Sequence, residues 1–271
     1  MTPATDRVAH TSLRGLLDRP AYTDGTMLRV IAPLVDLLDK PNGKRDRQLW
    51  LGDDLRVIDR DHGHVFAQTG KDGYCGWLSE AAVGEAAPPT HHITAPATHL
   101  YPSPSVQSPE IASLPMGARV TVSAQTEAWA QTPLGCIPAP HLAPLGQWAT
   151  DPAAVAESLL GSPYLWGGNS RAGIDCSGLV QLAHLACGLK CPADSDLQQT
   201  LGTAIPDDTH QRGDLIFWRG HVALVTDPQT LIHANGHTMS VVHEPIAVCI
   251  ARIEAQTGGT VTHRRRPFLL A

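Results

Sequence analysis

The chain has 271 residues, a length that favours two or three domains. Hydrophobic residues make up 42% of it, enough for packed cores, and the formal charge of −6 lacks the basic excess of a nucleic-acid-binding protein. No apolar run approaches the ~18 residues of a membrane helix, and the first residues lack the pattern of a secretory signal. We therefore expect a cytoplasmic protein with neither nucleic acid nor membrane among its partners.

Residues 1–28 contain one short helical pattern, TSLRGLL, and then a turn-rich connection. Beyond them the sequence resembles itself at an offset of about 60 residues, since IAPLVDLLDKP at 31–41 is similar to TAPATHLYPSP at 94–104. In each copy, short β-branched runs separated by glycine, aspartate or proline predict a small antiparallel β-barrel. We place the two barrels at 29–88 and 92–145.

From about residue 150, helical patterns come first and strands follow. Asp151 and Asp175 stand where N-caps are expected, and Gly188 ends the second helical run. The expected strands are DLIFW at 214–218, HVALV at 221–225, TLIHA at 230–234, MSVVH at 239–243 and VCIAR at 248–252. This order predicts an α+β domain over 150–271, in which helices pack on an antiparallel sheet.

The six cysteines are too scattered for a disulfide scaffold, and in a reducing compartment we expect free thiols. Cys187 and Cys191, with His184 nearby, have a spacing that suits metal ligands, but no second ligand pair at matching spacing accompanies them. We therefore expect no metal site. The sequence assigns no role to Cys75, Cys136, Cys187, Cys191 or Cys249.

Cys176 differs from the other cysteines because it directly follows the expected N-cap Asp175 and so stands at the first position of a helix. There the free backbone N–H groups and the positive end of the helix dipole favour a thiolate. Gly178 permits the close approach of another backbone or of a substrate. Cys176 is therefore a candidate nucleophile, with a small buried core residue as the alternative.

Two histidines on consecutive expected strands, His221 and His233, are candidates for the base that such a nucleophile needs. A two-residue loop at TDPQT would send their rings to opposite faces of the sheet, whereas a three-residue loop or a single bulge would put both on one face. On one face, one imidazole can act as general base and acid while the other fixes its tautomer. Ordinary strand histidines are the alternative, since the chain has 14 histidines.

The motifs PYLWGG, DCSGLVQ, GDLIFW, HVALV and IHA occur in one order within residues 150–267. That segment resembles the NlpC/P60 family of papain-like cysteine peptidases. The resemblance implies a papain-like α+β fold with Cys176 as nucleophile, His221 as base and His233 as the orienting third residue. It implies no metal and no cofactor. Members of the family hydrolyse amide bonds of bacterial cell-wall peptides, typically the bond between γ-D-glutamate and a diamino acid.

The two barrels resemble bacterial SH3 domains, in which a hydrophobic-Gly-Trp strand like CGWL at 75–78 is typical. The second copy lacks the Gly-Trp pair, which makes it a degenerate SH3-like domain, and we expect it to act as a spacer. Paired SH3-like domains before an NlpC/P60 domain resemble the γ-D-glutamyl-L-diamino acid endopeptidases, also called dipeptidyl-peptidase VI. That subgroup acts on murein peptides with a free N-terminal L-alanine.

This second resemblance implies a set of substrate-binding residues, namely Tyr74, Tyr164, Trp166, Asp175, Ser177 and Ser195. By it, Tyr74 reaches into the site from the first SH3-like domain. Tyr164 is a candidate for assisting the oxyanion, together with the Cys176 backbone N–H. Asp175 can face the substrate ammonium, and Ser177 and Ser195 the glutamyl carboxylate. The alternatives are that Tyr74 belongs only to the barrel core, that Trp166 is only a structural wall, and that Ser195 is a plain loop or helix-cap serine.

Together the resemblances predict an intracellular cysteine peptidase that cleaves murein tri- and tetrapeptides during peptidoglycan recycling. The alternatives are a secreted hydrolase of polymeric peptidoglycan and a non-catalytic module that binds wall peptides. Because intact murein lies outside the membrane, the expected cytoplasmic location favours recycled fragments. The sequence does not reveal which diamino acid is preferred.

Overall fold

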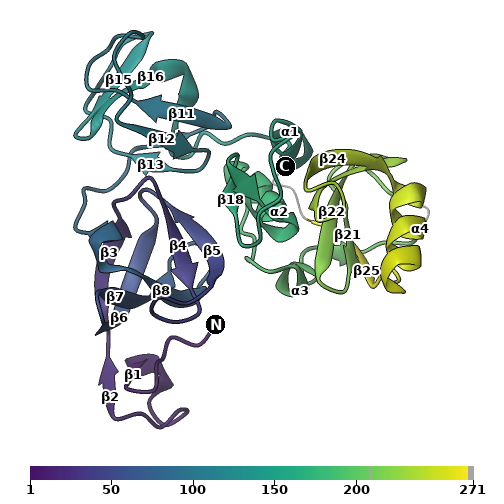
Figure 1. Ribbon diagram of the computed structural model, residues 1–271, viewed down its shortest axis with the longest axis horizontal. Coiled ribbons are helices and arrows are strands. Elements are labelled where there is room, and N and C mark those ends of the chain that lie inside the picture. Colours follow the sequence, from purple (N-terminus) through teal and green to yellow (C-terminus); the bar gives the residue numbers. More distant parts are fainter. Residues whose placement is uncertain (208, 268–271) are drawn as a thin grey trace. The chain divides into compact units, whose positions relative to one another are not determined.

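The computed structural model describes residues 1–207 and 209–267, and the chain folds into two compact units, 1–145 and 146–271 (Figure 1). Strands dominate the first unit, and the second combines helices with one large sheet. None of the described helices has the length and apolarity that crossing a membrane requires.

The N-terminal segment contains two short parallel strands, β1 (Val8–His10) and β2 (Ala21–Thr23). The helical pattern predicted between them forms only a single 3-10 turn, η1 (Thr11–Leu13). Gly15 follows that turn at φ 80°, a left-handed backbone conformation that a right-handed helix does not include. The expectation of a helix over TSLRGLL is therefore wrong beyond its first turn.

The first barrel-like sheet has seven strands in the order β5-β4-β8-β7-β6-β3-β9. They are β3 (Thr26–Val30), β4 (Leu34–Leu38), β5 (Arg45–Trp50), β6 (Asp54–Asp61), β7 (His64–Thr69), β8 (Cys75–Ser79) and β9 (Val83–Gly84), with a 3-10 turn, η2 (Glu80–Ala82), before β9. Alternate side chains point into one core, formed by Val30, Leu37, Leu49, Leu55, Val57, Val65, Ala67, Leu78 and Val83. This one-sided burial explains the alternating pattern of the sequence.

Residues 91–144 repeat the strand pairing of the first sheet in shorter strands. They are β10 (His91–Ile93), β11 (Ala97–Leu100), β12 (Ala112–Pro115), β13 (Arg119–Val120), β14 (Ala124–Gln125), β15 (Trp129–Thr132), β16 (Gly135–Pro138) and β17 (Leu142–Pro144), with η3 (Ala139–His141) before β17. Strand β10 pairs with β13 and β17 as β3 pairs with β6 and β9. Likewise β11 pairs with β12 as β4 with β5, and β15 pairs with β16 as β7 with β8.

The second unit is built on a six-stranded sheet in the order β20-β25-β21-β22-β23-β24, with antiparallel neighbours throughout (Figure 1). Its strands are β20 (Thr203–Ala204), β21 (Leu215–Trp218), β22 (His221–Asp227), β23 (Thr230–Asn235), β24 (Ser240–Pro245) and β25 (His263–Arg266). Its helices are α1 (Pro152–Glu157), α2 (Cys176–Ala186), α3 (Ser195–Gln198) and α4 (Ile246–Thr257), and a small hairpin of β18 (Asn169–Ser170) and β19 (Gly173–Ile174) precedes α2. Helices α1 and α2 pack on each other and contact β22 and β23, while α4 covers a face of the sheet through Ile246 and Cys249.

The predicted caps of the first two helices are confirmed. The Asp151 carboxylate accepts a hydrogen bond of 2.9 Å from the Ala153 N–H, and that of Asp175 accepts one of 2.6 Å from the Gly178 N–H. Gly188 follows α2 at φ 72°, as a C-terminal stop should.

The strand expected at VCIAR is wrong, because residues 248–252 lie inside α4. Pro245 precedes the helix and Gly258 ends it at φ 69°. The residues that face the sheet, from Ile246 through Cys249 and Ile250 to Ile253, follow the spacing of a helix rather than the alternation of a strand.

Candidate active site

Cys176 is the first residue of α2 and is only 8% exposed. The Asp175 carboxylate before it accepts hydrogen bonds from the Gly178 N–H, from the Gly167 N–H at 2.9 Å and from the Ser177 hydroxyl at 3.2 Å. One buried carboxylate thus caps the helix and ties the preceding loop to it. The sulfur is held on a rigid element, at the end of a helix that favours negative charge.

The glycines around Cys176 permit close packing of backbone against backbone. A Cβ atom on Gly178 would lie 2.6 Å from the Gly168 carbonyl oxygen, and one on Gly168 would lie 2.4 Å from that of Gly173. Gly167 takes φ 70°. The glycine-rich sequence before the cysteine therefore lets a tight loop pass under the first turn of α2.

Two aromatic residues of this loop differ in exposure. Tyr164 is half-buried, and burial raises the pKa of its phenol to about 12, with further contributions from the charges of Cys176 and Asp175. The phenol therefore stays protonated at neutral pH and can donate a hydrogen bond. Trp166 is 70% exposed and offers an open apolar surface.

His221 and His233 lie on the same face of the sheet. In the β22–β23 hairpin Val225 pairs with Leu231 and Asp227 pairs with Thr230, so that Thr226 is an extra residue. This bulge offsets the two-residue loop, which alone would have put the rings on opposite faces. Of the arrangements left open by the sequence, the structure contains the single bulge.

A row of hydrogen bonds joins these histidines to an acid. His221 Nε2 lies 2.9 Å from His233 Nδ1, and the ring centroids are 5.1 Å apart at an angle of 62°. His233 Nε2 lies 3.1 Å from Glu244 Oε2. Arg252 in turn holds both carboxylate oxygens of Glu244, at 2.9 and 2.7 Å. The arrangement leaves Nδ1 of His221 outside the row.

Burial keeps both rings neutral. It lowers the pKa of His221 to about 3, with further lowering by His233 and Arg252 and an opposing effect of Glu244. It lowers the pKa of His233 to about 4, against the charge of Glu244. The hydrogen bonds from Arg252 lower the pKa of Glu244, which is therefore an anion at neutral pH. A neutral imidazole at the end of the row can accept a proton.

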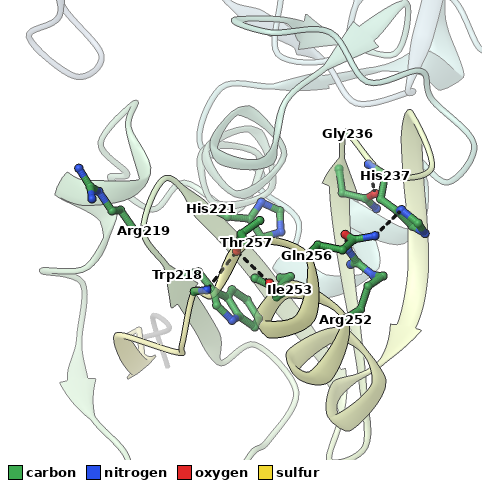
Figure 2. A pocket seen from close by; sticks show the side chains of 11 residues that line it. Trp218, Arg219, His221, Gly236, His237, Arg252, Ile253, Gln256 and Thr257 are labelled. Atoms are coloured by element: carbon green, nitrogen blue, oxygen red, sulfur yellow. Dashed lines mark hydrogen bonds between the residues drawn. The ribbon is translucent and has the colours of Figure 1, made fainter.

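A pocket of about 600 Å³ opens beside His221 (Figure 2). It is lined by Trp218, Arg219, His221, Asn235, Gly236, His237, Arg252, Ile253, Gln256, Thr257 and Gly259. Figure 2 shows Arg219 at one side, His237 and Gln256 at the other, and Trp218 and His221 between them. Its lining contains arginine and histidine side chains but no carboxylate, so it suits a negatively charged group.

His233, Glu244 and Cys249 offer three donor atoms that all lie within 4.8 Å of one another. This set fits a metal poorly. Arg252 already occupies both oxygens of Glu244, and burial raises the pKa of the Cys249 thiol to about 12, so that the sulfur is protonated.

The remaining predicted site residues lie in different surroundings. Ser177 is buried and donates to Asp175, while Ser195 is half-buried at the first residue of α3. Tyr74 belongs to the first unit, where it is partly buried against the core of the seven-stranded sheet.

Sequence reasoning missed Asn235, Glu244 and Arg252. Asn235 follows the IHA motif by one residue. Glu244 lies on the neighbouring strand, where its register opposite Leu231 puts it on the face of His233. Strand alternation could have found it only once that pairing was known.

Known proteins match both units. The profile of the NlpC/P60 family matches residues 161–252, and that of the bacterial dipeptidyl-peptidase Sh3 domain matches residues 37–83. The second unit is an NlpC/P60 cysteine peptidase domain. The first unit contains the Sh3 domain, in its seven-stranded sheet.

The chain spans different shares of the curated relatives that it matches. A γ-D-glutamyl-L-lysine dipeptidyl-peptidase of Bacillus cereus is 28% identical over 232 residues, which cover 70% of this chain and 67% of the relative. Dipeptidyl-peptidase 6 of Lysinibacillus sphaericus is 41% identical over 81 residues, or 30% of each chain. The chain thus spans about two thirds of the first relative and less than one third of the second.

The crystal structure of an NlpC/P60 family protein from Bacillus cereus is similar to this one with a TM-score of 0.76 at 20% identity. The similarity covers 90% of this chain and 100% of the other. It shows the fold, in which an NlpC/P60 domain accompanies an SH3-like domain.

Proposed function

We propose that Cys176, His221 and His233 form the catalytic triad of a peptidoglycan hydrolase. The observation that carries the proposal is the hydrogen-bonded pair of neutral imidazoles in the unit whose second helix begins with a capped cysteine. Nδ1 of His221 takes the thiol proton as the sulfur attacks the amide carbonyl. The same nitrogen then protonates the departing amine, leaving a thioester that water hydrolyses to a carboxylic acid and the free thiol.

The proposed bond is the amide between γ-D-glutamate and a diamino acid, in peptides with a free N-terminal L-alanine. The names of the two relatives support this choice, since one is a γ-D-glutamyl-L-lysine dipeptidyl-peptidase and the other a dipeptidyl-peptidase. Removal of a dipeptide suits short free peptides better than a polymer. We therefore propose a cytoplasmic enzyme of murein-peptide recycling.

The substrate-binding roles follow the chemistry of each side chain. The protonated phenol of Tyr164 is the proposed donor to the oxyanion, together with the Cys176 N–H. The buried Asp175 carboxylate is the proposed partner of the substrate ammonium, in addition to its three hydrogen bonds within the loop and helix. Ser177 and Ser195 are proposed for the glutamyl carboxylate, and Trp166 and Tyr74 for the walls of the site.

The pocket beside His221 is the proposed site of the leaving portion of the substrate. The base must hand its proton to the departing amine, so the diamino acid has to lie against the His221 ring. Arg219 and His237 in the lining suit a carboxylate there. The proposal favours a diamino acid with its own side-chain carboxylate, diaminopimelate, over lysine.

We also propose that residues 92–145 are a second, degenerate SH3-like domain. The support is the recurrence of the strand pairings and of the 3-10 turn before the last strand. Its strands are short and it lacks the Gly-Trp pair, which fits a spacer better than a binding surface.

Incubation of the protein with L-Ala-γ-D-Glu-diaminopimelate and, separately, with whole sacculi tests the function. We expect L-Ala-γ-D-Glu to appear from the peptide and nothing to be released from sacculi. Release from sacculi would favour a secreted wall hydrolase. Binding without turnover of either would favour a wall-peptide binding module.

A further inference from the structure

Two side chains compete for one nitrogen of His233. Glu244 Oε2 lies 3.1 Å from Nε2, and the Asn235 side-chain nitrogen Nδ2 lies 3.0 Å from the same atom. A carboxylate only accepts a hydrogen bond, whereas an amide nitrogen only donates one. A neutral ring carries a proton on Nε2 or leaves it bare, so it satisfies one neighbour at a time.

The orientation of the Asn235 amide is fixed by the loop that follows. Its oxygen accepts hydrogen bonds from the backbone N–H groups of His237 at 3.0 Å and Thr238 at 2.8 Å. Exchange of the amide oxygen and nitrogen would lose both bonds. Nδ2 is therefore the atom that points at His233, and the competition is built into the fold.

The two neighbours select opposite tautomers of the whole pair. If Nε2–H of His233 donates to Glu244, Nδ1 of His233 is bare and accepts from Nε2–H of His221. Nδ1 of His221 is then bare and basic. If Asn235 donates to His233 instead, each ring carries its proton on Nδ1, and the nitrogen of His221 outside the row is already protonated.

We propose that Glu244, held by Arg252, is a positioning residue that selects the basic tautomer of His221 against the opposing demand of Asn235. The inference deepens the proposed function and rests on it. A hydrogen bond to a charged acceptor is roughly twice as strong as one between neutral groups, so the carboxylate prevails over the amide. Arg252 keeps Glu244 ionised and aimed, with two hydrogen bonds to its oxygens.

Glu244 is the carboxylate that lies within hydrogen-bonding distance of the row, at Nε2 of His233. Besides the two histidines on β22 and β23, the titratable groups at the His233 end of the row are Glu244 on β24, and Cys249 and Arg252 on α4. Among them only Glu244 is an anion that can accept a hydrogen bond from the His233 ring, because the Cys249 thiol is protonated. Selection of the tautomer therefore falls to one residue.

The test measures kcat and KM of the full chain on L-Ala-γ-D-Glu-diaminopimelate. Glu244→Gln removes the charge at nearly constant shape, and we expect kcat to fall about 10- to 100-fold with KM within about 3-fold, a part of the ~10²–10⁴ that acid–base catalysis supplies. Glu254→Gln is the matched control, since Glu254 is an exposed glutamate on α4, and should leave kcat unaltered.

A second substitution separates tautomer selection from a structural role. Asn235→Asp keeps the oxygen that binds the two backbone N–H groups and replaces the competing donor with a carboxylate acceptor at His233. In the Glu244→Gln background we expect it to restore kcat to within about 3-fold of the starting protein. Restoration supports the inference, because lost packing would not be repaired by a change on another strand.

Two outcomes overturn the inference: an unchanged kcat in folded Glu244→Gln, or a loss that Asn235→Asp does not recover. Cys176→Ala and His233→Ala report on the proposed function itself. If they lose turnover while Glu244→Gln keeps it, only the inference fails. If both keep turnover, the triad assignment fails.

Discussion

Two histidine sites in the second unit, His184 on α2 and the His221–His233 pair on the sheet, differ in what surrounds their rings. His184, in the middle of α2, is 1% exposed, and burial lowers its pKa, as it does for His221 and His233. Its Nδ1 lies 2.8 Å from the Val180 carbonyl oxygen, and its Nε2 has no hydrogen-bond partner. It is a histidine locked into the turn of its own helix.

The comparison shows that burial makes an imidazole neutral but is not enough to make it a general base. In His184 one ring nitrogen bonds a backbone carbonyl and the other has no hydrogen-bond partner. In His221 one nitrogen is engaged by His233 and the ring lines a pocket. A base needs a fixed tautomer and an accessible second nitrogen together, and only the sheet histidines have a network that can provide them.

The largest expected effect separates the two sites by activity. His221→Ala should lower kcat at least about 10³-fold, as removal of a general base does, and Cys176→Ala should remove turnover. His184→Leu should keep kcat within about 3-fold. Steady-state kinetics on the tripeptide, with circular dichroism as the folding control, measures this. Equal losses of kcat in His184→Leu and His221→Ala would contradict the distinction between a structural and a catalytic histidine.

The next effect is shared by both sites and concerns stability in acid. The folded-state pKa of each ring lies below the unfolded value near 6.5, at about 3 for His221 and about 4 for His233. The unfolded chain therefore binds more protons as the pH falls below 6.5, and stability present above that value is lost. At pH 5 the free energy of unfolding should be lower than at pH values above 6.5, by about 2 kcal/mol for each of these two rings.

Urea unfolding of the second unit at pH 7 and pH 5 measures that loss. Because the pKa of His184 is lowered as well, His184→Leu should make the loss between the two pH values smaller. A pH dependence identical in His184→Leu and the starting protein would show that His184 does not titrate differently on folding.

A smaller effect is expected at the rim of the pocket. Arg219 is exposed at one side of it (Figure 2). Arg219→Gln should lower kcat/KM for the diaminopimelate peptide by about 10-fold and leave the lysine peptide within about 2-fold, since only the former carries the extra carboxylate. Arg171→Gln, another exposed arginine, is the control. Equal effects on both peptides would contradict the proposed diamino acid preference.

Local chemistry made parts of this unit predictable. Asp151 and Asp175 follow from capping rules, and the close approach of another backbone at Gly178 follows from its lack of a side chain. The hairpin could be narrowed to a few loop types, one of which is present, because strand alternation has only two phases.

Other parts depend on pairings that no local pattern encodes. Glu244 meets His233 only through the register of β23 with β24. Asn235 lies two residues from His233 on the same strand, but its amide is oriented by the backbone N–H groups of His237 and Thr238. The apolar residues of α4 were mistaken for a strand because a short run such as VCIAR is compatible with both periods. The role of Tyr74 remains a prediction from resemblance.

Because of the extra residue in β22, the two rings share a face of the sheet only for every second length of the hairpin. Inserting or deleting one residue between His221 and His233 would turn one ring to the other side of the sheet, while a change of two would restore the match. Length variation in this segment should therefore occur in even steps among active enzymes. A single odd step would leave a folded sheet whose two rings no longer meet.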